Sequence, residues 1–175
     1  KLTIDFSLRA VGRLARFLPV AFASPDDAEA RRECLLGSLE AGIAFTNSSV
    51  ALVHGMARPL GAKFGIPHGV SNAVLLEAIM RFSLPGAPER YARLAEAMGA
   101  VPAGTPLETA RAGLGIVSRL VRELHIPRLR DLLSRDALDA QLDAMVREAV
   151  ASGSPANNPR PASPEEIASL YGEAF

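Results

Sequence analysis

The sequence is short of cysteine and carries no excess charge of either sign. Cys34 is the only cysteine among 175 residues, so no disulfide can form within the chain. A lack of disulfides is typical of proteins from a reducing compartment, and we expect a cytoplasmic protein. Nineteen basic residues balance nineteen acidic ones. Without a basic surplus, we expect neither nucleic acid nor an anionic membrane as a partner.

Long apolar runs and glycine-rich phosphate loops are also missing. The longest uncharged stretch, residues 41–57, is interrupted by polar side chains and is shorter than the about 20 apolar residues of a membrane span. No glycine-rich loop follows a strand pattern, so this chain alone does not predict dinucleotide binding. Ser71 lacks the setting of a nucleophile elbow. No signal peptide or initiator Met opens the chain, and we expect a domain cut from a larger protein.

What the sequence does contain is helical periodicity. No segment alternates with period two, whereas apolar residues recur every three or four positions throughout. The pattern predicts an all-α fold of about eight helices, and the length suits one domain over residues 1–175. The apolar stripes that carry this prediction are Leu8–Phe22, Leu35–Ile43, Leu75–Phe82, Leu114–Leu124, Leu138–Ala149 and Ile167–Tyr171.

Three segments carry the residues that commonly begin a helix. Thr105 and Ser163 are each followed by proline and, three positions on, by glutamate, which is the capping-box pattern. The segment 24–27 is similar, and it predicts Ser24 as the N-cap with Pro25 in the first helical position.

Two of the three histidines lie in one stretch, residues 46–76. His54 and His68 are fourteen positions apart, with a turn signalled between them by Gly65 and Pro67. Pro67 is expected at the first position of the second helix. Such a pair suits two helices that meet at a turn. By spacing alone it is a weak metal signal, because a lone histidine on an apolar helix is more often part of the core and a catalytic metal needs about three protein ligands. His125 ends a helical stretch and is interpreted as structural.

The same stretch resembles a known family. The blocks VHGMA at 53–57, PLGA at 59–62 and PHG at 67–69 resemble the signature of the iron-containing (group III) alcohol dehydrogenases. Flanking blocks agree over essentially the whole chain, including GIAF at 42–45 and NPR at 158–160.

The resemblance implies a fold, a site and a reaction. The chain is similar to the family's C-terminal domain, the helical domain that this family shares with dehydroquinate synthase-like proteins. His54 and His68 match two of the four metal ligands, while an Asp and a further His would precede Lys1. The implied cofactors are Fe(II) or Zn(II), and NAD or NADP bound by an N-terminal domain that this chain lacks. The implied substrate is a small alcohol or aldehyde.

Two positions depart from the family pattern. Arg58 stands where many members have a second histidine, near the substrate and the nicotinamide. Either Arg58 pairs with a substrate carboxylate, or it forms a salt bridge or faces solvent. Glu77 replaces a residue that is more often proline.

Other functions remain open on the sequence alone. A relative with the same fold and other chemistry would be similar to glycerol dehydrogenase, maleylacetate reductase or dehydroquinate synthase. A non-enzymatic alternative is a helical module that keeps the fold without activity. A homo-oligomer is compatible with the sequence, and the fragment alone is expected to be inactive.

Overall fold

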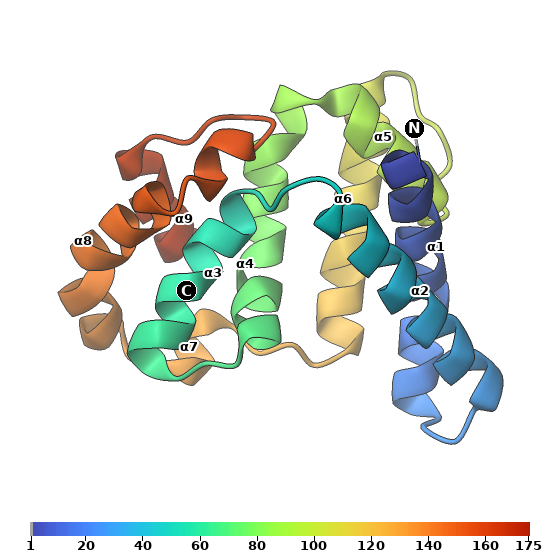
Figure 1. Cartoon of the computed structure of the whole chain (residues 1–175), viewed down its shortest axis with the longest axis horizontal. Coiled ribbons are helices and arrows are strands. Elements are labelled where there is room, and N and C mark those ends of the chain that lie inside the picture. The colour runs from blue at the N-terminus through green and yellow to red at the C-terminus, as the bar shows by residue number, and fades with distance from the viewer. Residues whose placement is uncertain (1) are drawn as a thin grey trace. The chain divides into compact units, whose positions relative to one another are not determined.

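The structure is a computed structural model that describes residues 2–175. Its regular elements within this range are all helical, which confirms the predicted fold class. Nine α-helices are present there, and the one beyond the expected eight, α7, has only four residues. The helices are α1 Leu2–Ala23, α2 Ala28–Thr46, α3 Leu52–Phe64, α4 His68–Ser83, α5 Pro88–Ala97, α6 Pro106–Glu123, α7 Leu129–Leu132, α8 Arg135–Ala151 and α9 Pro164–Ala174, with 3₁₀ turns η1 Leu84–Gly86 and η2 Ser154–Asn157 (Figure 1).

The helices form two compact units. The first contains α1, α2, α5 and α6, and the second contains α3, α4 and α7 to α9. In the part of the chain that the structure describes, no helix is both long enough and apolar enough to cross a bilayer.

In the first unit, α1 and α2 lie side by side as an antiparallel pair (Figure 1). The face of α2 toward α1 is charged: Glu40 is 5% exposed and accepts hydrogen bonds from Arg9 Nε at 2.8 Å and Arg13 Nε at 3.1 Å. Arg13 also pairs with Glu33. Buried carboxylates need such partners, because an unpaired buried charge is strongly destabilising.

The apolar stripe of α2 therefore points outward. Leu35 is 71% exposed and Leu39 is 60% exposed, and Leu36 and Ile43 on the same stripe are also exposed. The stripe of α1 divides in a similar way, since Leu8 is half-buried while Phe22 is exposed. Periodicity correctly located these helices, but it did not show which face of α2 the unit buries.

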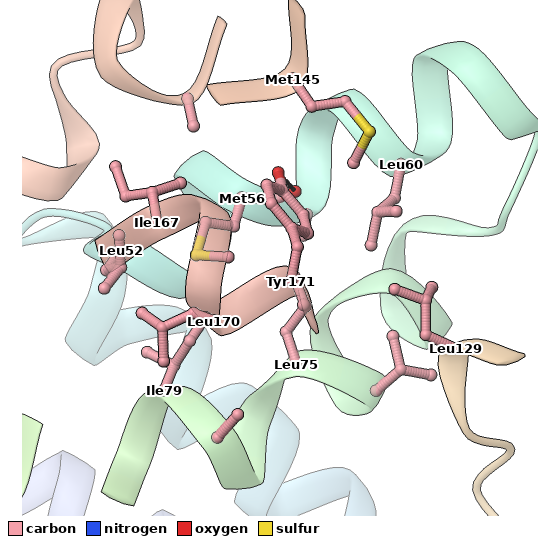
Figure 2. Close-up of a cluster of buried hydrophobic side chains, with 14 of the residues drawn as sticks. Leu52, Met56, Leu60, Leu75, Ile79, Leu129, Met145, Ile167, Leu170 and Tyr171 are labelled. Atoms are coloured by element: carbon pink, nitrogen blue, oxygen red, sulfur yellow. Dashed lines mark hydrogen bonds between the residues drawn. The ribbon is translucent and has the colours of Figure 1, made fainter. Parts of the chain in front are cut away.

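The second unit has a continuous hydrophobic core. Tyr171 of α9 is fully buried in it, surrounded by side chains from α3, α4, α7 and α8 (Figure 2). Its hydroxyl donates a hydrogen bond to the Met56 carbonyl oxygen at 2.7 Å, which satisfies the one polar group of the ring. The labelled members of this core are Leu52, Met56, Leu60, Leu75, Ile79, Leu129, Met145, Ile167, Leu170 and Tyr171.

The capping predictions have a mixed outcome. Thr105 and Ser163 both form complete capping boxes, as expected. The prediction for Ser24 was wrong. Ser24 N–H still bonds to Val20 O and so completes α1, and α2 begins later, with Asp27 accepting from Ala30 N–H at 2.9 Å. Pro67 was also misplaced by one position, because it is the N-cap of α4 and His68 is the first helical residue.

Candidate metal centre

The site begins on α3, which presents His54 and Arg58 one turn apart. Residues four positions apart lie on the same helical face. The other faces of α3 are buried through Leu52, Met56 and Leu60. His54 is half-buried and Arg58 is exposed, so this face borders the core and opens to solvent.

A tight turn brings the start of α4 back to α3. Gly65 ends α3 in the left-handed conformation, with φ of 68°, where a side chain would be strained. Ile66 is buried beneath the turn, and its carbonyl oxygen accepts a hydrogen bond from the fully buried Ser71 hydroxyl at 3.2 Å. These contacts fix the first turn of α4, where His68 lies.

The turn places the two imidazoles against each other. The ring centroids of His54 and His68 are 5.5 Å apart and the ring planes are tilted by 52°. Two imidazoles on one tetrahedral ion, each with a Zn–N bond of about 2.0–2.1 Å, have ring centres on the order of 5 Å apart. The expected proximity of the two side chains is therefore present, while the metal role itself remains a proposal.

The surroundings of His54 favour the form that binds metals. Burial lowers the pKa of His54, and the neighbouring His68 and the positive charge of Arg58 lower it further. The neutral imidazole is the species that donates a lone pair to a metal. The lowered pKa therefore favours the ligand form of His54.

Asn72 adds a second polar group beside His68. Its Nδ2 lies 2.8 Å from the His68 carbonyl oxygen and 3.2 Å from His68 Nε2. Its Oδ1 is buried and has no hydrogen-bond partner among the described residues. A buried carbonyl oxygen without a donor is costly, so this atom indicates a polar group that the described residues do not supply.

These observations fit a metal, but with an incomplete set of ligands. Two imidazoles are donors that Fe(II) and Zn(II) both accept. No cluster of three or more ligating side chains occurs within residues 2–175. His125 does not join the pair in such a cluster; it follows α6 with a positive φ of 52°, in the position where a helix usually ends with glycine. A metal bound here would need ligands in addition to these two histidines.

The two departures from the family pattern have different surroundings. Glu77 forms an ion pair with Arg81 at 2.9 Å on the surface of α4. Arg58 forms no ion pair with any carboxylate of residues 2–175, so the salt bridge considered for it is not present there.

Sequence reasoning missed the contacts of Asn72 and Asn158. Asn158 is buried, and its amide bonds to Ser83 Oγ at 2.9 Å and to the Arg160 carbonyl oxygen at 2.7 Å. It thereby ties the end of α4 to the loop before α9. For Asn72 a signal existed, since a position four residues after a histidine on a helix shares its face.

Comparisons with known proteins point to a single family. The family model for the C-terminal part of the Fe-containing alcohol dehydrogenase family matches residues 1–175. A 1,3-propanediol dehydrogenase of Klebsiella pneumoniae is 36% identical over 97% of this chain and 43% of its own length. A lactaldehyde reductase of Escherichia coli K12 is 38% identical over 99% of this chain and 45% of its own.

A solved structure agrees with the sequence matches. The crystal structure of a 1,3-propanediol oxidoreductase superposes with a TM-score of 0.94 and 35% identity, over 100% of this chain and 46% of that one. The chain thus spans less than half the length of the relatives that it matches.

Proposed function

Since the chain belongs to the Fe-containing alcohol dehydrogenase family, we propose that residues 1–175 are the helical, metal-binding C-terminal domain of an NAD(P)-dependent oxidoreductase that interconverts alcohols and aldehydes. The observation that carries the proposal is the paired arrangement of His54 and His68, with ring centroids 5.5 Å apart at an open edge of the second unit.

In this proposal His54 and His68 supply two ligands of an Fe(II) or Zn(II) ion. When bound, the metal would act as a Lewis acid toward the substrate oxygen, and the nicotinamide would exchange hydride with the substrate carbon. The ligands still required would come from the polypeptide that precedes residue 1. The orphaned Oδ1 of Asn72 supports this arrangement, because it calls for a further polar neighbour at the same place.

The residues of this chain hold the site in position. The buried side chains of α3 fix the helix that carries His54, and the turn at Gly65 fixes His68 opposite it. Both ligands therefore lie on regular helices over a packed core, which is what a site needs to keep ligand geometry within a fraction of an ångström.

The nucleotide would be bound by an N-terminal domain of the same protein. Support comes from the lengths of the relatives, of which this chain covers 43% to 46%. The outward apolar stripe of α2 gives independent support, since a stripe that includes Leu35 and Leu39 is the kind of surface that a soluble protein covers with another domain.

We propose that the whole protein acts in the cytoplasm.

The proposal is tested with the full-length protein, its metal exchanged in turn for iron and zinc. NAD⁺- and NADP⁺-linked oxidation of a series of small primary alcohols, diols and hydroxy acids, and the reverse reduction of the corresponding aldehydes, are followed by absorbance of the reduced cofactor. We expect turnover that chelation abolishes and that one of the two metals restores. Turnover unaffected by complete metal removal would exclude the metal role, and failure with every alcohol, aldehyde and cofactor would exclude the proposed reaction.

A further inference from the structure

We propose that Arg58 binds an anionic group of the substrate, so that the preferred substrates are hydroxy acids and the corresponding aldehyde acids rather than simple alcohols. The inference rests on the proposed function, because it places the reacting oxygen at the His54–His68 pair. It adds the chemical class of the substrate, which neither the metal nor the cofactor specifies.

The position of Arg58 is the first support. It lies one helical turn beyond His54 on the same face of α3, and the rise of one turn is about 5.4 Å. Its neighbours in sequence, Ala57 and Pro59, are both buried, so the backbone at this point is anchored in the core. The guanidinium thus extends from a rigid position toward solvent beside the candidate metal ligands.

The lack of an acidic partner is the second support. Two other cations of the same unit have acidic partners within residues 2–175: Lys63 pairs with Glu148 at 2.8 Å and Arg81 pairs with Glu77 at 2.9 Å. Arg58 pairs with no carboxylate in that range, and its positive charge instead bears on His54. The face that carries the two imidazoles therefore has a positive charge without a carboxylate partner in that range.

The chemistry of arginine selects the anion. A guanidinium is planar and presents two parallel N–H donors, which match the two oxygens of a carboxylate. During oxidation, the C–H hydride of the alcohol carbon passes to NAD(P)⁺, the hydroxyl proton is released and the C=O bond forms. The carboxylate is unchanged, so its contact with Arg58 holds the substrate without taking part in the reaction.

The test uses full-length protein and matched substrate pairs that differ only in the distal group. One series contains glycolate, 3-hydroxypropionate, 4-hydroxybutyrate and 5-hydroxyvalerate, and the other contains the 1-alkanols of equal carbon number. Arg58→Ala, Arg58→Lys and wild type are compared. Arg147→Ala is the control, because Arg147 is an exposed arginine on α8 and its replacement causes the same change in net charge.

We expect wild type to have the higher kcat/KM for a hydroxy acid. Arg58→Ala should raise KM for that acid about tenfold to a hundredfold with little change in kcat, because a charge-assisted hydrogen bond contributes binding in both the ground state and the transition state. Arg58→Lys should recover part of the loss. The 1-alkanols should respond little to any of these changes, and Arg147→Ala should behave as wild type.

Two other outcomes separate failure of this inference from failure of the proposed function. Good turnover of 1-alkanols, with Arg58→Ala affecting both series equally or neither, would overturn the role of Arg58 and leave the proposed reaction intact. No NAD(P)-linked oxidation of either series would overturn the reaction, and the inference with it.

Discussion

At the scale of single residues, the sequence indicated that His54 and His68 lie close together but did not reveal the other polar groups around them. The turn signal at Gly65 and Pro67 predicted two helices that meet, and the rings lie 5.5 Å apart. The spacing did not reveal the buried, unpartnered Oδ1 of Asn72, because hydrogen bonding of a side chain depends on which groups the fold brings near it.

The first prediction concerns the two histidines in the full-length protein. His54→Ala and His68→Ala should each reduce metal affinity by more than the 10–100-fold that loss of an outer-shell partner costs, because each removes a direct ligand. Metal content after dialysis against a metal buffer measures this. His125→Ala is the control, since His125 lies outside the pair. Full metal content in both histidine variants would rule out the assignment.

The second prediction concerns Tyr171, whose hydroxyl bonds to the Met56 carbonyl oxygen. Tyr171→Phe should lower the free energy of unfolding by about 0.5–1.5 kcal/mol, as expected for one intramolecular hydrogen bond. Burial is the main cause that raises the pKa of Tyr171 above its usual value of about 10. The folded state therefore keeps a proton that the unfolded chain releases, and stability falls as the pH rises above about 10.

Urea titrations of both proteins at neutral pH and near pH 11 measure these effects. The contribution of Tyr171 to the alkaline loss should disappear in Tyr171→Phe. An equal loss of stability in the two proteins over that pH range would mean that the hydroxyl is not held in its protonated form by the core.

At the scale of elements, helix positions followed from periodicity, but one helix start did not follow from its motif. The segment 24–27 predicted Ser24 as the N-cap, whereas Asp27 holds that position in the structure. Ser24 does not cap α2 because its N–H donates the last hydrogen bond of α1, to the Val20 carbonyl oxygen, so that Ser24 belongs to the end of the preceding helix. Competition between adjacent elements decides such cases.

The third prediction compares these two caps. Asp27→Ala should destabilise the protein by about 1 kcal/mol, because the Ala30 N–H loses its side-chain acceptor. Ser24→Ala should change stability by less than about 0.5 kcal/mol, the range of ordinary surface substitutions. Thermal unfolding of the two variants measures the difference. A larger effect at Ser24 than at Asp27 would restore the interpretation based on the motif.

At the scale of the whole molecule, the inverted polarity of α2 is the feature that periodicity could not resolve. A stripe of leucines predicts a buried face, yet the first unit buries Glu40, which pairs with Arg9 and Arg13, and leaves Leu39 exposed. A sequence pattern indicates that a helix has an apolar face, but it does not indicate which part of the protein covers that face. In the proposed function the covering surface is the part of the protein that precedes residue 1.

The fourth prediction follows from that cover. In the full-length protein Leu39→Glu should cost at least about 2 kcal/mol, because burying an unpaired carboxylate against apolar surface is strongly unfavourable. In the isolated 175-residue chain the same change should cost little, since the side chain is 60% exposed. Val101→Glu is the control, because Val101 is 81% exposed in the same unit. Equal tolerance of Leu39→Glu in both proteins would show that α2 stays uncovered.

The last prediction concerns the activity of the isolated chain. Hydride transfer requires the nicotinamide and the substrate carbon within contact distance, and positioning of this kind accounts for about 7–11 kcal/mol of rate acceleration in well-oriented systems. Residues 1–175 supply two proposed metal ligands and no nucleotide motif. The purified chain, given iron or zinc, an alcohol or hydroxy acid, and either cofactor, should therefore show no turnover above a heat-denatured control. Its metal affinity should also be far below that of the full-length protein, because two imidazoles replace a complete shell. Metal-dependent reduction of NAD(P)⁺ by the chain alone would show that the catalytic apparatus lies entirely within these helices.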